Sequence, residues 1–144
     1  MAVLVLLFGS LVLYRSLGAL GVAPLAAWVS SARLAMATMF VFTAVAHFAP
    51  MKKDLIAMVP PALPRPHLLV LFTGVLELAG AIGLLLEPTR RWAAFGLIAL
   101  LMAMFPANVS AARRGTKLRG RPATPFWIRA PMQVLFVLWL WWAR

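Results

Sequence analysis

Five apolar runs, each close to the length of a membrane-spanning helix, limit this chain to one broad architecture. They cover residues 1–23, 32–49, 68–86, 92–112 and 126–143. Hydrophobic residues make up 64% of the 144 residues, and a soluble domain of this length could not bury so much apolar surface in one core. The sequence therefore predicts an all-α fold, a polytopic transmembrane helix bundle with five spans, or four if the first run lies flat.

Charge is sparse and strongly basic in this chain. There are 14 Lys and Arg against three Asp and Glu, and charged residues are only 12% of the total. The basic residues lie between and at the ends of the apolar runs, where they would meet anionic headgroups, and they form no stripe suited to nucleic acid. Membrane lipids are the expected partners, and no nucleic-acid partner is expected. The densest basic loop holds Arg113, Arg114, Lys117, Arg119 and Arg121.

Cysteine is absent and there are only two histidines. This composition excludes disulfides, thiol chemistry and cysteine-based metal sites, and we expect no metal site.

Prolines mark the connectors between the runs. Pro50 and Pro60 enclose about two turns of helix that combine a charged patch with apolar residues, which is typical of a segment lying in the membrane interface. We take residues 50–66 as an interfacial segment. Before the last run, Thr124 and Pro125 predict a helix that starts with a threonine N-cap and a proline in the first turn.

An acidic residue inside an apolar run needs a physical reason. A charge at the centre of a membrane helix costs roughly 2.5–3.5 kcal/mol on insertion scales. Glu77 lies about 15 Å into the third run, with Thr73 one turn before it and the small residues Gly80 and Ala81 on the same side. This helix face is therefore expected to point into the bundle.

Four other polar residues are expected at the same end of the bundle. Arg129 and Gln133 share one face of the last run, and the long Arg129 side chain could reach towards Glu77 and neutralise it. His47 ends the second run on this side, and Asn108 lies near the same end of the fourth. We predict a ligand-binding site formed by Glu77, His47, Asn108, Arg129 and Gln133.

Three interpretations of this polar cluster stay open. It could tie helices together, because buried polar groups must find partners. It could bind the polar head of a small, largely apolar ligand. It could also support proton-coupled or electron-coupled chemistry, although the chain encodes no redox group.

Several segments, in order, resemble the DoxX family of small integral membrane proteins. They are Arg33 opening a helix that closes with Ala46-His47-Phe48, then Met51-Lys52-Lys53-Asp54, Met58-Val59-Pro60-Pro61, Thr73-Gly74-Val75-Leu76-Glu77-Leu78-Ala79-Gly80-Ala81, Phe105-Pro106-Ala107-Asn108 and Trp127-Ile128-Arg129-Ala130-Pro131-Met132-Gln133. The resemblance spans about three quarters of the chain.

The resemblance implies a single membrane domain over residues 1–144. Its four-helix DoxX-like core would be residues 32–143, and residues 1–23 would add an N-terminal membrane helix. It also implies a bacterial or archaeal plasma membrane, that is, the inner membrane in many bacteria.

The function implied is that of a non-catalytic accessory subunit in a membrane redox or stress-related system. Such a subunit could hold a quinone or another lipid-like molecule near Glu77 and contact other membrane proteins or redox-system subunits. Two alternatives remain. One is a membrane-protein assembly factor or scaffold, and the other is an enzyme that transfers protons on a lipid-soluble substrate with Glu77 or His47 as acid or base.

Overall fold

The chain folds into long helices joined by short connectors. A computed structural model describes residues 2–118, 120–122 and 124–144. Of the basic loop, Arg119 lies outside the described residues. The elements in order are α1 (Ala2–Ala19), the 3-10 helix η1 (Ala23–Leu25), α2 (Trp28–Phe48), α3 (Lys52–Met58), α4 (Pro66–Leu85), α5 (Arg90–Arg113), β1 (Lys117–Leu118), β2 (Arg121–Pro122) and α6 (Phe126–Ala143).

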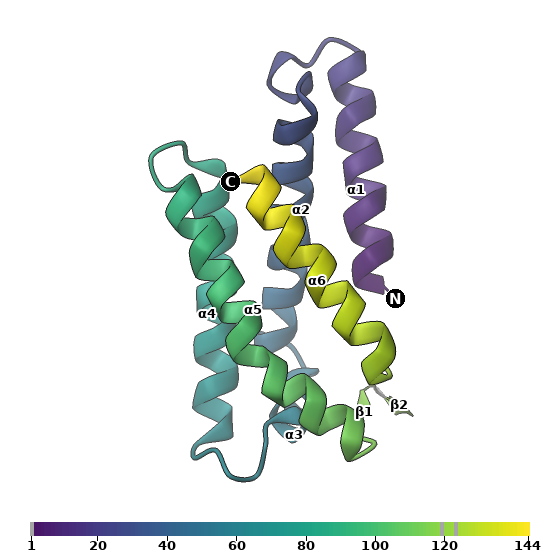
Figure 1. Ribbon diagram of the computed structural model, residues 1–144, viewed down its shortest axis with the longest axis vertical. Coiled ribbons are helices and arrows are strands. Elements are labelled where there is room, and N and C mark those ends of the chain that lie inside the picture. The colour runs from purple at the N-terminus through teal and green to yellow at the C-terminus, as the bar shows by residue number, and fades with distance from the viewer. Residues whose placement is uncertain (1, 119, 123) are drawn as a thin grey trace.

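Five of these helices, α1, α2, α4, α5 and α6, are long and apolar enough to cross a membrane. This confirms the predicted all-α polytopic bundle. The strands are two residues each and form a small antiparallel hairpin in the basic loop. The helix α1 runs alongside α2 in Figure 1, and the Tyr14 and Thr38 hydroxyls lie 2.8 Å apart between them. This arrangement supports five spans rather than four.

The centre of the bundle is α2. It packs against α1 on one side, against α4 on another and against α6, while α5 packs against α4 and α6 (Figure 1). Among the described residues, α4 and α6 do not pack against each other. This neighbour relationship decides which polar side chains can meet.

Helix boundaries differ from the prediction by a few residues. The second helix starts at Trp28, four residues before the predicted Ala32, so Arg33 lies inside the helix rather than at its opening. Its Nε donates a hydrogen bond of 2.9 Å to the carbonyl of Ala143 at the end of α6. The predicted threonine N-cap of α6 is wrong: Pro125 occupies the N-cap position, and no side chain caps this helix.

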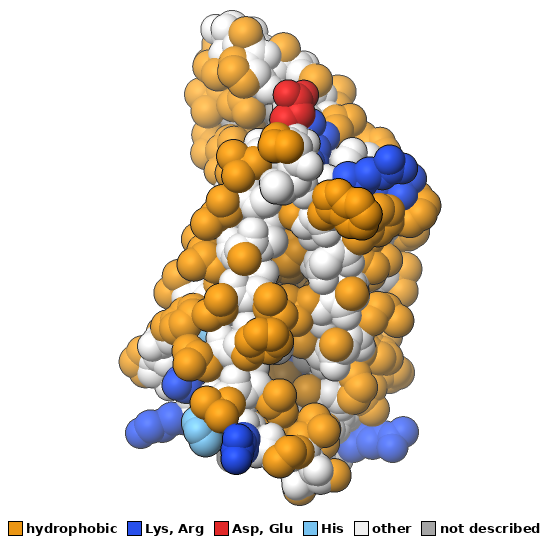
Figure 2. Space-filling view, turned by 90° about the vertical axis from the view of Figure 1, so that its left-hand side faces the viewer, with side chains coloured by type: hydrophobic (Ala, Val, Ile, Leu, Met, Phe, Trp, Pro, Cys, Tyr) orange, Lys and Arg blue, Asp and Glu red, His pale blue; other side chains and the backbone are white. Residues whose placement is uncertain are grey.

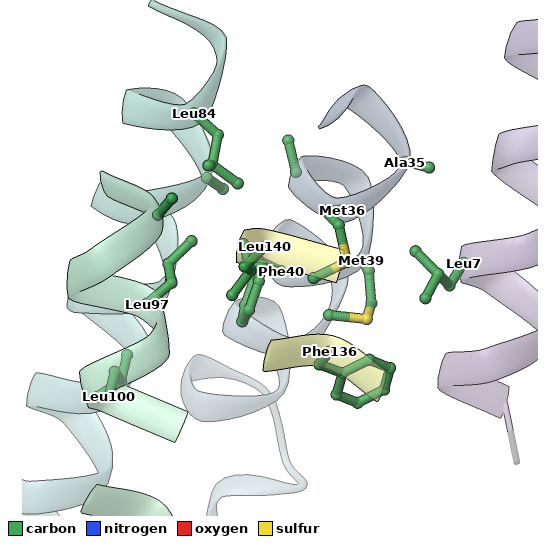
Figure 3. Close-up of a cluster of buried hydrophobic side chains, with 13 residues drawn as sticks. Leu7, Ala35, Met36, Met39, Phe40, Leu84, Leu97, Leu100, Phe136 and Leu140 are labelled. Atoms are coloured by element: carbon green, nitrogen blue, oxygen red, sulfur yellow. The ribbon is translucent and has the colours of Figure 1, made fainter. Parts of the chain in front are cut away.

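The apolar core lies between α2 and the other long helices. Phe40, Met36 and Met39 of α2 are buried there, together with Leu97 of α5 and Leu140 of α6 (Figure 3). Met36 and Met39 thus fill space in the core, as flexible apolar side chains commonly do. The core occupies the half of the bundle away from α3.

Residues 50–66, predicted to be interfacial, contain the short helix α3 and a connector that leads to α4. Three consecutive carbonyls at the end of α3, those of Ala57, Met58 and Val59, accept hydrogen bonds from Arg114 Nη2 at 2.9–3.1 Å. A cation at a helix C-terminus neutralises the partial negative charge of the exposed carbonyls. Arg114 therefore holds α3 against the end of α5.

Candidate functional site

The clearest candidate is a buried polar centre between α2 and α4, formed by Thr43, His47, Thr73 and Glu77. We call it the α2–α4 centre. Glu77 and His47 are each only 4% exposed. Glu77 Oε1 lies 3.6 Å from His47 Nε2, and Glu77 Oε2 lies 2.7 Å from the hydroxyl of Thr43. The acidic side chain predicted to point into the bundle does so, and its neighbours come from α2.

Close packing of the two helices makes this contact possible. Gly74 of α4 faces His47, and a Cβ added at Gly74 would lie 2.5 Å from His47 Cβ and 2.9 Å from its Cγ. Any larger residue would force the helices apart. Small residues allow this close approach between membrane helices, and here the approach presses the imidazole against α4 one turn before Glu77.

The hydrogen bonds of His47 fix where its protons lie. Nδ1 is 2.6 Å from the carbonyl of Val70, and a carbonyl can only accept, so Nδ1 carries a proton. Nε2 then faces the carboxyl group of Glu77. A bare nitrogen lone pair facing a carboxylate would repel it, so a proton on Nε2 or on Glu77 would favour this contact. One proton shared by His47 and Glu77 would make the pair electrically neutral in both arrangements.

The two threonines can adapt to either arrangement. Thr43 lies within hydrogen-bonding distance of both Glu77 Oε2, at 2.7 Å, and the carbonyl of Phe40, at 3.1 Å. Its single hydroxyl proton goes to an ionised Glu77, or to Phe40 when a protonated Glu77 donates to Thr43. Thr73 donates to the Val70 carbonyl at 3.0 Å and lies 3.3 Å from His47 Nδ1. The centre can thus hold its proton at two positions without losing partners.

The other three predicted site residues form a separate group between α5 and α6. We call Asn108, Arg129 and Gln133 the α5–α6 group. Arg129 Nη1 donates to Asn108 Oδ1 at 2.6 Å, and its Nε donates to the carbonyl of Thr124 at 2.8 Å. Gln133 Nε2 donates to the carbonyl of Leu101 at 2.8 Å. Asn108 and Arg129, both expected at the same end of the bundle, are thus in direct contact.

The predicted Arg129–Glu77 pair is wrong. No ion pair joins these two residues in the described part of the chain, because α6 packs on α5 and α2 and not on α4. Arg129 donates its hydrogen bonds to an amide oxygen and a backbone carbonyl rather than to a carboxylate. Glu77 is matched by the histidine from the neighbouring helix.

Sequence reasoning missed two components of the α2–α4 centre. Thr43 lies four residues before His47, a spacing that places both side chains on one helix face, and this was the available signal. The Val70 carbonyl carries no such signal, because its role depends on the packing of α2 against α4. A search of the described residues finds no group of three or more His, Asp or Glu side chains that could hold a metal ion.

The arrangement offers both a hydrogen-bond donor and an acceptor in an apolar setting. The separation of 3.6 Å between Nε2 and Oε1 is longer than a hydrogen bond, which normally joins such atoms at 2.7–3.2 Å. These two atoms are therefore close to each other without being joined by a direct hydrogen bond.

Comparison with known proteins gives one match. A family model described as "Domain of unknown function (DUF8561)" matches residues 36–144. No curated protein and no solved structure matches the chain.

Proposed function

The chain belongs to the family of that domain of unknown function, and we propose that it is a non-catalytic accessory membrane protein whose α2–α4 centre receives the polar head of a quinone-like or other lipid-like molecule. The resemblance to the DoxX family supports the role of an accessory subunit in a redox or stress-related system. It also supports a bacterial or archaeal plasma membrane as the location. The match to the family model brings no activity with it.

One observation carries the ligand proposal. His47 Nε2 and Glu77 Oε1 lie 3.6 Å apart, and one proton shared by the pair would let a carbonyl oxygen accept from it and a hydroxyl donate to it. Quinone-like molecules present carbonyl or hydroxyl groups on an apolar body. Val70 and Phe40, which flank the centre, are buried and apolar and suit such a body.

A second candidate is an assembly factor or scaffold, favoured by a different feature of the same centre. Every side chain of the α2–α4 centre already has a partner within the chain, which is also what a purely structural tie between helices requires. In that function the outer faces of the helices would bind other membrane proteins, and the centre would only hold α2 to α4.

The test is native mass spectrometry with solvent extraction of the purified full chain. Glu77→Gln keeps the shape of the side chain but cannot carry the shared proton. Its matched control is Glu87→Gln, because the Glu87 side chain is 89% exposed and lies outside the helices. We expect a defined small apolar molecule to accompany the wild type and Glu87→Gln, and to be absent from Glu77→Gln.

Circular dichroism on the same samples verifies that Glu77→Gln remains folded. Identical extracts from all three proteins, with only bulk phospholipid present, would contradict the ligand proposal. The scaffold function would then be preferred, and co-purification of membrane proteins with wild type and Glu77→Gln would be the next comparison.

A further inference from the structure

A groove runs along the outer face of the bundle between α4 and α5. Its volume is about 680 Å³, within the range of small-molecule sites. Figure 2 views the side of the molecule formed by α4 and α5, with apolar side chains along most of its length and basic side chains gathered near both ends. This groove is separate from the α2–α4 centre, which is buried on the inner side of α4.

Glycines of both helices line the groove. Gly80 and Gly83 of α4 pack directly on Leu97 and Ala93 of α5, so the helix backbones approach each other closely at the floor. Gly96 of α5 also lines the groove, but a Cβ added there would meet no atom within 4 Å. The space beside Gly96 is therefore unfilled by the chain itself.

One end of the groove lies beside the basic start of α5. Its lining there includes Thr89 and Trp92, and between these residues lie Arg90 and Arg91 at the start of α5. The Nε of Arg90 is buried and has no hydrogen-bond partner among the described residues. Its guanidinium lies 4.0 Å from Glu87, whose side chain is almost fully exposed and so screens it weakly. Trp92 is 77% exposed, as expected for an aromatic residue at the level of the headgroups.

The geometry points to a binding site for one anionic glycerophospholipid, with an acyl chain in the α4–α5 groove and its phosphate at Arg90 and Arg91. The apolar lining suits a hydrocarbon chain. The two arginines supply positive charge at the groove end that faces the headgroups, and arginine pairs well with phosphate oxygens.

A second copy of this chain fits the groove less well. Two copies inserted in the same direction would place their Arg90 and Arg91 side chains at the same depth and close together. Like charges facing each other across an interface are unfavourable. The phosphate of an anionic lipid would instead attract these arginines.

The test uses the delipidated full chain in detergent, with phosphatidylglycerol or phosphatidylcholine added, and native mass spectrometry as the readout. Gly96→Leu adds a side chain in the groove, and its Cβ would meet no atom within 4 Å. Its control is Gly9→Leu, since a Cβ at Gly9 of α1 would also meet no atom within 4 Å. The double variant Arg90→Gln/Arg91→Gln removes the headgroup charges, and Lys52→Gln/Lys53→Gln removes the same charge at the other end of the bundle.

We expect one phosphatidylglycerol per wild-type chain. Gly96→Leu and Arg90→Gln/Arg91→Gln should each weaken binding by about tenfold or more, while both controls and Glu77→Gln bind like wild type. Equal binding of phosphatidylcholine and phosphatidylglycerol would overturn the inference. So would unchanged binding by Gly96→Leu, equal losses in the two charge variants, or a wild-type dimer that Gly96→Leu dissociates.

Discussion

The two polar groups of this bundle stabilise an ionisable side chain among apolar helices in different ways. In the α2–α4 centre, an acid is buried 3.6 Å from a histidine of a helix pressed closely onto it, and one shared proton would make the pair neutral. In the α5–α6 group, Arg129 pairs with no acid in the described part of the chain and donates to an amide oxygen and a backbone carbonyl, in a less buried position. A buried acid here is neutralised by its neighbour, whereas the cation is solvated by neutral oxygens.

The difference has a consequence for function. A cation that rests on neutral oxygens has one protonation state, so the α5–α6 group can hold helices or orient a ligand but cannot exchange a proton. The α2–α4 centre has two positions for one proton and threonines that accommodate both. Mutations should therefore affect the two groups unequally.

The largest effect is expected for His47→Leu. This change leaves Glu77 buried with only Thr43 as a partner, and breaking a buried pair is strongly destabilising. We expect the free energy of unfolding in mixed micelles to fall by about 3 kcal/mol. His67→Leu is the matched control, because His67 is exposed at the start of α4, and it should unfold like the wild type. An equal loss of unfolding free energy in both variants would show that the burial of His47 does not cause the destabilisation.

The next largest effect is expected for Gly74→Val. The added atoms would overlap His47, so α2 and α4 must separate, and overpacking of this kind costs about 2 kcal/mol. Gly9→Val in α1 is the control, since a Cβ there meets nothing within 4 Å. The measurement is again the free energy of unfolding. A stable Gly74→Val protein would mean that close packing does not position His47.

A smaller effect is expected for Arg129→Met. The change keeps much of the apolar stem but leaves the Asn108 and Thr124 oxygens without their donor, at a cost of about 1 kcal/mol. Arg113→Met, at an exposed position near the end of α5, serves as control. A loss for Arg129→Met as large as that for His47→Leu would remove the distinction between the two groups.

The smallest effect on stability is expected for Glu77→Gln. The amide keeps the shape of the side chain and can still bond Thr43 and His47, so the free energy of unfolding should change by less than about 1 kcal/mol. What it loses is the shared proton. A loss of several kcal/mol would show that the carboxyl group serves mainly to hold the helices together.

The sequence predicted the helices well because apolar length alone decides where a membrane helix can lie. The last run, residues 126–143, coincides with α6, and the others differ by a few residues at their ends. The depth of Glu77 and the pairing of Asn108 with the end of α6 also followed from the positions along the helices.

What the sequence could not supply was the order of helices around the bundle. Depth made Arg129 a reasonable partner for Glu77, but α6 packs on α5 and α2, and His47 is brought to Glu77 by the contact at Gly74. The prediction of a Thr124 N-cap was wrong for a local reason. Pro125 itself takes the N-cap position, and the Thr124 carbonyl accepts a hydrogen bond from Arg129. Neighbour relationships of this kind are tertiary, and helical periodicity does not encode them.

The most direct measurement is a pair of double-mutant cycles on the free energy of unfolding. One cycle combines His47→Leu with Glu77→Leu, and the other combines Arg129→Met with Glu77→Leu. We expect a coupling of about 1 kcal/mol or more between His47 and Glu77, and additive effects within about 0.5 kcal/mol for Arg129 and Glu77. The opposite pattern, with Arg129 coupled to Glu77 and His47 independent of it, would contradict the one-proton pair between α2 and α4.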